Sequence, residues 1–243
     1  MGSFLGAVIE RQSGLPERYK KKTSGLFNRS FCFRCGHQLS WRENIPILSY
    51  LLLRGRCSHC RSPIPYWLPL IEIAGAASGV AIAAHMSQIG LIRLIGLIVV
   101  SGVFLWIFFS DLVYGAVPDL AVASGMIGGI AVHQGEQFGP YLLSAIGAAL
   151  FFLLLVVITR GKGMGTGDVT LAALVGFLLG WPGTVVAVWL AFVTGAFVGI
   201  LLIVMKRKTL KQTVPFGPFL IAATVAAPLV APWLDKLFMF GVK

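Results

Sequence analysis

Apolar residues dominate the chain after residue 65 and form seven long runs separated by short polar breaks. These runs cover residues 66–84, 92–110, 117–133, 141–159, 169–181, 184–205 and 217–233. Most approach the roughly 20 residues that a helix needs to cross about 30 Å of hydrocarbon, and the shortest needs flanking residues to do so. The pattern predicts an all-α polytopic membrane protein with seven transmembrane helices.

The N-terminal quarter of the chain follows a different pattern. Residues 1–9 are apolar but too few to cross a bilayer alone, so they are predicted to be the end of a truncated first transmembrane helix or an interfacial stub. A cleaved signal peptide is not expected, because no basic segment or small-residue cleavage site precedes the charged stretch. Residues 10–65 are predicted to be a polar loop, 66–235 a transmembrane bundle and 236–243 a short tail.

Composition narrows the class of protein. The 243 residues are 57% hydrophobic and only 12% charged, whereas about 25% of the residues of a soluble domain are charged. So few charges leave too little polar surface to cover a globule in water, which excludes soluble domains. Intrinsic disorder is excluded for the opposite reason, since the chain is far too apolar.

The basic residues are concentrated on one side of the predicted membrane topology. If residues 10–65 are cytoplasmic, alternation places 111–116, 160–167 and 206–216 on the same side, and these four regions hold 17 of the 20 Lys and Arg. The loops on the opposite side hold no Lys or Arg. The three remaining basic residues, which depart from this asymmetry, are Arg93 in an apolar run and two lysines in the C-terminal tail. Cytoplasmic loops collect Lys and Arg, so membrane lipid and not nucleic acid is the expected partner of the +11 net charge.

All four cysteines lie in the predicted cytoplasmic loop. Cys32 and Cys35 form one Cys-x2-Cys pair, and Cys57 and Cys60 form another after 21 intervening residues. This is the spacing of a closed, structural four-thiolate zinc site. Two disulfides or four free thiols are the alternatives, and a reducing cytoplasm disfavours the disulfides. His37 and His59 are expected to be solvated loop residues and not ligands.

Acidic residues within or beside the apolar runs are the second chemical signal, because a carboxylate in hydrocarbon is expensive. There are four: Glu72, Asp111, Asp119 and Asp168. The topology places Asp111 and Asp168 at the same membrane face and Asp119 one turn inside the next helix. Two carboxylates held close suit a water-activating pair, one protonated and one ionised. Helix capping is the alternative for Asp119 and Asp168.

Glycine occupies every second position of residues 161–167, immediately before Asp168. In an extended chain these glycines lie on one face, where another peptide can approach the backbone closely. A protease needs such a surface to hold an unwound substrate. A flexible linker is the alternative, and a P-loop is excluded because no Gly-Lys-Ser/Thr follows.

Taken together, these segments resemble the type IV prepilin peptidases, which belong to the GxGD intramembrane aspartyl proteases. The resemblance rests on Gly165-Thr166-Gly167-Asp168, the paired cysteines, residues 41–50 and 54–57 beside them, Asp111-Leu112 with Pro118-Asp119, residues 214–220 (VPFGPFL), and residues 1–11.

The resemblance implies an activity and its residues. Such enzymes are multi-pass proteins of the bacterial inner membrane that remove the basic leader of prepilins and pseudopilins at the cytoplasmic face. The substrates serve type IV pili or type II secretion. The catalytic pair carries over to Asp111 and Asp168, with Asp119 as a supporting residue. Members with the cysteine loop usually also methylate the new N-terminus with S-adenosylmethionine, and Glu43, Gly55 and Glu72 become candidates for that site.

Other functions stay open at the level of sequence. The chain departs from the family pattern at Gly6 and Thr170, which leaves a peptidase without methyl transfer as one alternative. A proton-coupled transporter also places carboxylates and glycines in helices, but it should show repeat symmetry between its halves, and none is found. A zinc-stapled adaptor has no need for two matched aspartates.

Overall fold

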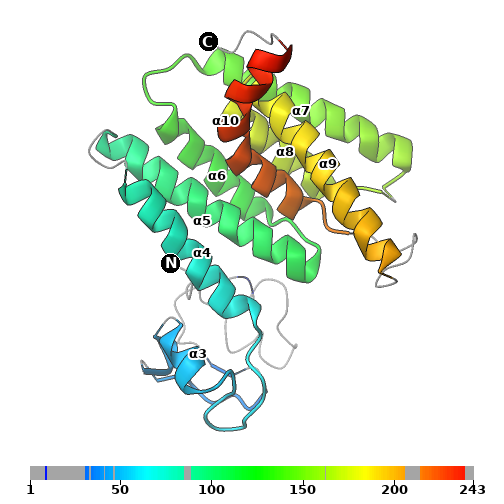
Figure 1. Cartoon of the computed structure of the whole chain (residues 1–243). Coiled ribbons are helices and arrows are strands. Elements are labelled where there is room, and N and C mark those ends of the chain that lie inside the picture. Colours follow the sequence, from blue (N-terminus) through cyan, green and yellow to red (C-terminus); the bar gives the residue numbers. More distant parts are fainter. Residues whose placement is uncertain are drawn as a thin grey trace. The chain divides into compact units, whose positions relative to one another are not determined.

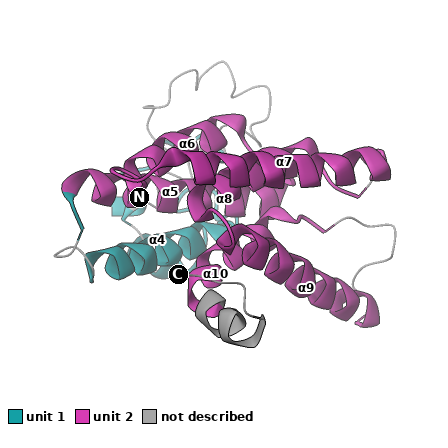
Figure 2. Cartoon of the chain, turned by 90° about the horizontal axis from the view of Figure 1, so that it is seen from above, with its two compact units in different colours: residues 1–90 teal, residues 91–243 magenta. Residues whose placement is uncertain are grey.

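The computed structural model describes residues 9, 31–32, 34–40, 42–45, 47–84, 89–161, 163–205 and 214–238 (Figure 1). The predicted N-terminal stub therefore lies outside the described residues except for Ile9, and of the predicted tail only residues 236–238 are described. The chain divides into two compact units, residues 1–90 and 91–243 (Figure 2). The helix that follows the cysteine loop groups with that loop. The division at residue 65, which rests on membrane environment, stays a prediction.

The described elements are helices, apart from two isolated β-bridges. The first unit contains the 3-10 helix η1 (Arg42–Asn44), α3 (Leu48–Leu52) and α4 (Trp67–Ala83). The second unit contains α5 (Leu91–Tyr114), α6 (Asp119–Val132), α7 (Phe138–Thr159), α8 (Thr166–Leu179), α9 (Gly183–Val204) and α10 (Gly217–Phe238). The prediction of an all-α fold is confirmed for the described residues.

Each of the seven predicted apolar runs coincides with one helix, but not every helix is long enough to cross a membrane by itself. Three of the described helices, α5, α7 and α9, have the required length and hydropathy. The other apolar segments among the described residues are shorter: α4, α6, α8 and residues Gly217–Val230 of α10. α6 and α8 have 14 residues each, which is about 21 Å at 1.5 Å per residue. The structure thus supports a membrane protein with three long apolar helices.

Helix α8 is the central helix of the second unit, which explains why it can be short. It contacts α6, α7, α9 and α10, and half of its residues are buried. At Gly176 the backbone of α7 comes so close that an added Cβ would lie 2.6 Å from the Ser144 carbonyl oxygen. Small residues allow such close approach between apolar helices. Other helices of the protein therefore cover most of α8.

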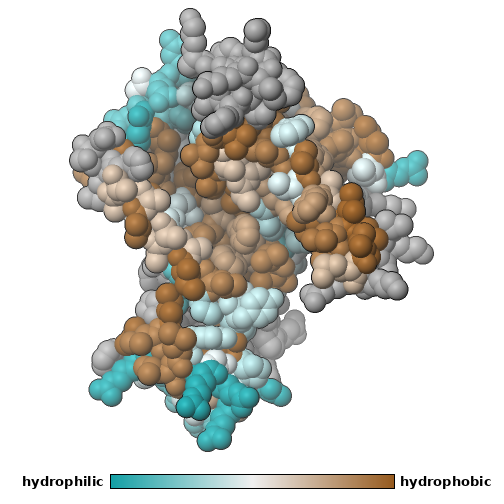
Figure 3. Space-filling model, in the orientation of Figure 1, coloured by the Kyte–Doolittle hydropathy of each residue, from teal (hydrophilic) through white to brown (hydrophobic). Residues whose placement is uncertain are grey.

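The outer helices carry the exposed apolar side chains. Leu143 on α7 is 72% exposed and Phe197 on α9 is 68% exposed. Figure 3 shows that hydrophobic residues cover much of the visible surface of these helices. A surface of this kind fits contact with lipid, where apolar side chains need no burial in protein.

A polar cluster joins the helix ends at one end of the second unit. The Arg93 guanidinium forms a 2.8 Å ion pair with Glu136 and donates to the Val132 carbonyl. Hydrogen bonds from Tyr141 and from the buried His133 also reach Glu136, and they lower its pKa below the usual value. Arg93 was an exception to the predicted charge asymmetry, and this local carboxylate partner accounts for it.

Candidate active site and metal centre

Asp111 lies buried in the last turn of α5. Its Oδ2 atom accepts a 2.9 Å hydrogen bond from the main-chain N–H of Gly217, the first residue of α10. The first N–H groups of a helix have no partner within the helix, and the helix dipole makes that end positive. The start of α10 is therefore a favourable environment for the Asp111 carboxylate.

A side chain at position 217 would displace the Asp111 carboxyl group. An added Cβ would lie 2.6 Å from Asp111 Oδ2 and 3.2 Å from its Cγ. The ring of the neighbouring Phe216 packs against two other phenylalanine rings. Its centroid lies 5.0 Å from that of Phe192 on α9 and 5.8 Å from that of Phe152 on α7. In the Pro-Phe-Gly-Pro segment, Phe216 thus anchors the start of α10, and the next residue, Gly217, holds Asp111. The sequence pattern assigns no role to this segment, although a glycine flanked by Pro215 and Pro218 at the start of an apolar run was a signal for one.

Asp168 is the third residue of α8 and is also buried. Its Oδ2 accepts a 3.0 Å hydrogen bond from the N–H of Gly165, which is the N-cap residue. The predicted capping interaction is present, as the carboxylate half of a capping box.

The prediction of an extended face of four glycines is wrong in part. Helix α8 begins at Thr166, so Gly167 is helical and not extended. An added Cβ at Gly167 would lie 2.9 Å from Val117 Cβ, whereas at Gly165 its nearest neighbours would be 3.9 Å away. Gly167 packs the α8 start against the loop before α6, and Gly165 leaves open space beside Asp168.

The structure brings Asp111 and Asp168 together. The two carboxyl groups interact electrostatically although they lie 57 positions apart in the sequence. Within the described part of the chain, neither carboxyl group takes part in an ion pair. Two adjacent carboxyl groups without a neutralising cation favour a state in which one keeps its proton. Such a pair offers a proton acceptor and a proton donor at one place.

Asp119 is placed differently from the prediction. It is the first residue of α6, not one turn inside it, because the preceding Pro118 is extended and acts as the N-cap. Asp119 is exposed, and the α6 N-cap has no side-chain hydrogen bond. An acidic group in the first turn still suits the helix dipole. The structure leaves Asp119 outside the buried pair.

The four cysteines converge as their spacing predicts. Their Sγ atoms all lie within 4.8 Å of one another, and all four are free thiols. The Sγ atoms of Cys32 and Cys60 are 3.8 Å apart. Sulfur atoms at tetrahedral corners about 2.3 Å from a zinc ion would be about 3.8 Å apart. The donor set therefore fits a tetrahedral metal ion.

The two Cys-x2-Cys turns have the same backbone design, offset by 25 residues. The N–H of Cys32 donates to the His37 carbonyl at 2.8 Å, and the N–H of Cys57 donates to the Ser62 carbonyl at 2.9 Å. A positive φ follows each second cysteine, +72° at Gly36 and +53° at Arg61. An isolated β-bridge flanks each turn. Two matched turns that aim two sulfurs each at one point are a typical metal-binding arrangement.

Glu43 ties these two turns together. Its carboxylate accepts hydrogen bonds from the Ser40 N–H at 2.7 Å, the Ser40 hydroxyl at 2.8 Å and the Ser58 hydroxyl. These bonds, that of Ser58 foremost, lower the pKa of Glu43 to about 2. Because the unfolded pKa is about 4.3, they stabilise the loop above that pH and are lost as pH falls towards 2. His37 lies 3.9 Å from Glu43 and stacks on His59, so neither histidine belongs to the thiol cluster.

The other two candidate cofactor residues also have local structural contacts. Gly55 has a positive φ of +66°, and an added Cβ would lie 3.0 Å from the Tyr50 ring. The Glu72 Oε2 atom accepts a 2.7 Å hydrogen bond from the N–H of Ile47, the N-cap residue of α3. Gly55 and Glu72 therefore both border α3, while Glu43 faces the cysteine turns.

Comparisons with known proteins give the family. The bacterial Peptidase A24 N-terminal domain matches residues 1–86, and the type IV leader peptidase family matches residues 98–200. A Burkholderia pseudomallei protein named prepilin leader peptidase/N-methyltransferase is 37% identical, over 93% of this chain and 81% of the relative. Proteins of the same name from Aeromonas hydrophila and Pseudomonas aeruginosa are 33% and 31% identical, each over 98% of this chain and 88% of the relative. No solved structure matched the chain. The chain belongs to the type IV leader peptidase family.

Proposed function

We propose that this chain is a membrane-embedded aspartyl peptidase that removes the leader peptide of type IV prepilins and pseudopilins, and that it then N-methylates the new N-terminal residue. Family membership and the shared name of the relatives support both activities. The buried pair of Asp111 and Asp168 is the observation that carries the peptidase.

In the proposed reaction the ionised carboxylate takes a proton from water as the water oxygen bonds to the carbonyl carbon of the scissile peptide. The protonated partner gives its proton to the carbonyl oxygen. Collapse of the tetrahedral intermediate breaks the C–N bond. The carboxyl group that took the water proton gives it to the leaving amine, and a hydroxyl of the intermediate returns its proton to the other carboxylate, which restores the pair. The hydrogen bonds from Gly217 and Gly165 hold the two carboxyl groups in place through this cycle.

The cysteine loop is proposed to hold one structural zinc ion. Cys32, Cys35, Cys57 and Cys60 would supply four thiolates, which leaves no open coordination position for substrate. The small loop gains stability from such a metal, because it has too few apolar residues for a core of its own.

S-adenosylmethionine is the proposed methyl donor, and when bound it supplies an electrophilic methyl group. Glu43, Gly55 and Glu72 are retained as the proposed residues for this step. The contacts of Glu43 and Gly55 indicate that these two act by shaping the loop, since the Glu43 carboxylate is occupied by hydrogen bonds.

The proposed location is the bacterial inner membrane, with the cysteine loop and the aspartate pair at the cytoplasmic face. The charge asymmetry of the loops supports this orientation. In this proposed orientation the aspartate pair would face the side from which the basic leader of a prepilin or pseudopilin of a type IV pilus or type II secretion system is presented.

Replacing either aspartate of the pair should abolish cleavage. Asp111→Asn and Asp168→Asn should each lower the rate by at least about 10²–10⁴-fold, because asparagine neither accepts nor donates the required proton. Asp119→Asn is the matched control and should cut at close to the wild-type rate. A prepilin cleavage gel at equal expression measures all three. Cleavage at the normal rate by Asp168→Asn would refute the mechanism. If Asp119→Asn is inactive while Asp111→Asn is active, the catalytic partner of Asp168 is Asp119 and not Asp111.

Gly217→Ala should slow cleavage by about 10²-fold, because the new Cβ must displace the Asp111 carboxyl group, and small misplacements of reacting groups have effects of this size. Gly195→Ala on α9 is the control, since its Cβ would make an ordinary 3.6 Å contact with the Phe219 ring on α10. The rates come from the same gel assay, and thermal unfolding checks the fold. Equal rates for the two variants would show that the contact with Gly217 does not position Asp111.

Purified protein should contain about one zinc ion per chain, and Cys57→Ser should lower that content. His59→Asn alters the same turn without removing a thiol and should leave the metal content unchanged. Elemental analysis gives the stoichiometry. A metal-free native protein whose four thiols all react with a thiol reagent would contradict the zinc site.

Gly55→Ala should reduce methyl transfer more than leader cleavage, because strain at this positive-φ position distorts the loop and not the aspartate pair. Glu43→Ala should show the same bias. Gly79→Ala on α4 is the control, since its Cβ would meet open space. Mass spectrometry of the mature pilin separates the two products. Equal loss of both activities would argue against a methyl-transfer role for this loop.

A further inference from the structure

The short helix α3 presents an apolar surface in the otherwise polar cysteine loop. Leu48, Leu51 and Leu52 are 49%, 65% and 73% exposed, so three of its five residues offer large apolar side chains to the surroundings. Figure 3 shows hydrophobic side chains at the position that α3 has in Figure 1, next to hydrophilic side chains. Contact with water does not stabilise these leucines, and an exposed apolar patch of this kind marks a surface that binds protein or membrane.

A hydrogen bond holds the start of α3 beside Glu72 of α4. Glu72 is the sixth residue of α4 and lies about 7.5 Å along the helix axis from Trp67. Its carboxylate holds the N–H of Ile47, where α3 begins. From Ile47 to Leu52 the helix also extends about 7.5 Å. Whichever way α3 points, its far end therefore lies close to the level of Trp67 or further along α4.

If α4 crosses the membrane, the level of Trp67 coincides with the membrane boundary, and α3 lies at that boundary or below it. The 17 residues of α4 span about 25 Å, so nearly the whole helix is needed to cross about 30 Å of hydrocarbon. Tyr66 and Trp67 at its start are the aromatic residue types that gather at the interface. The end of α4 that carries Glu72 must then lie at the edge of the hydrocarbon, and α3 lies beside it.

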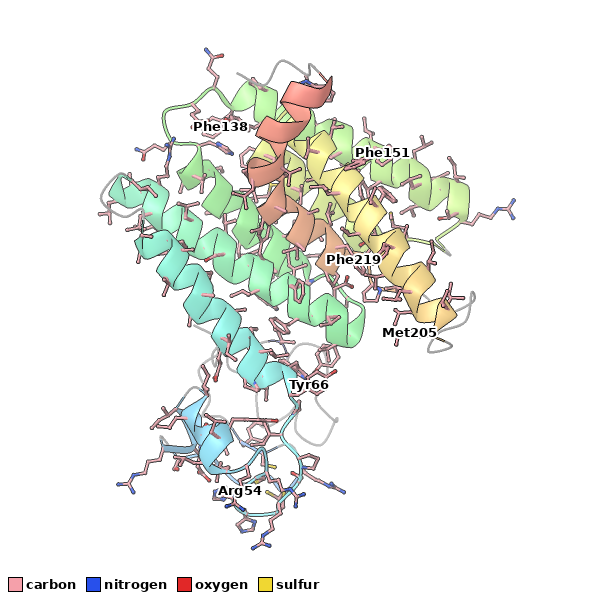
Figure 4. The ribbon with its side chains drawn as sticks, in the orientation of Figure 1. Arg54, Tyr66, Phe138, Phe151, Met205 and Phe219 are labelled. Carbon is pink, nitrogen blue, oxygen red and sulfur yellow. The ribbon has the colours of Figure 1, made fainter. Side chains whose placement is uncertain are left out.

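The charges next to α3 fit the lipid headgroups. Arg54 and Arg56 follow the helix directly and are both exposed. Figure 4 labels Arg54 in the loop and Tyr66 at the start of α4. Basic side chains at the cytoplasmic leaflet are attracted by anionic lipids, while apolar side chains on the same segment insert below the headgroups.

We propose that α3 is an interfacial helix whose three leucines insert into the cytoplasmic leaflet, with Arg54 and Arg56 at the anionic headgroups. This inference rests on the proposed crossing of the membrane by α4. It gives the cysteine loop a second attachment to the membrane, so that the loop lies against the surface from which a membrane-anchored substrate is presented.

The test uses the full-length protein in lipid nanodiscs that contain phosphatidylglycerol. A fluorescent amino acid replaces Leu52 on α3, Ala77 in the middle of α4, or Arg34 in the first cysteine turn. Nitroxide-labelled lipids with a shallow or a deep label serve as quenchers, and metal content confirms that each variant is folded. We expect the probe at 52 to be quenched more by the shallow label, the probe at 77 more by the deep label, and the probe at 34 by neither.

Each outcome bears on one of the two proposals. Quenching at 77 without quenching at 52 would overturn the interfacial role of α3, whether position 52 is open to water or covered by protein. Absence of quenching at 77 would instead refute the membrane crossing of α4. Arg54→Gln with Arg56→Gln should weaken the shallow quenching at 52 in phosphatidylglycerol. No change would refute the headgroup contact.

Discussion

A main-chain N–H at the start of a helix holds each of the two buried aspartates, and the arrangement of the second unit depends on this interaction. Asp168 binds the N–H of Gly165 at the start of α8, and Asp111 binds the N–H of Gly217 at the start of α10. A carboxyl group in an apolar interior is costly unless donors reach it. Helix starts are one of the few places in a membrane bundle where free N–H groups exist.

This requirement constrains the packing around the pair. The end of α5 must meet the start of α10, and the loop before α6 must meet the start of α8, where Gly167 packs on Val117. Helix α8, which carries Asp168 in its first turn, contacts four helices, and this burial in protein allows it to be short. The long helices α7 and α9 carry mostly exposed apolar side chains, which suits contact with lipid.

The sequence predicted the helices well because membrane insertion imposes a simple rule on apolar runs. All seven runs correspond to helices, and the errors lie at their ends, as at Asp119, where Pro118 delays the helix start. The convergence of Asp111 with Asp168 was also predictable, since buried carboxyl groups are rare. The cysteine spacing predicted the thiol cluster for a similar reason. Rare side chains in an apolar background carry most of the information.

The contacts that position these groups were not predictable, because they are made by main-chain atoms or by residues far apart. The N–H of Gly217 reaches Asp111 across 106 positions, and composition does not show a main-chain donor. Glu43 was predicted as a cofactor residue, yet the structure shows its carboxylate bonded to Ser40 and Ser58. A hydrogen-bonded carboxylate and a free one look the same in a sequence.

The central claim is that Asp111 and Asp168 act as one proton-exchanging unit, and a double-variant cycle measures this most directly. Residual cleavage rates are compared for Asp111→Asn, Asp168→Asn and the protein that carries both changes. Groups that act as a unit give losses that do not add. We expect the double variant to cut no more slowly than the slower single variant. Losses that multiply in the double variant would mean that the two carboxyl groups act independently, and would contradict the aspartate pair.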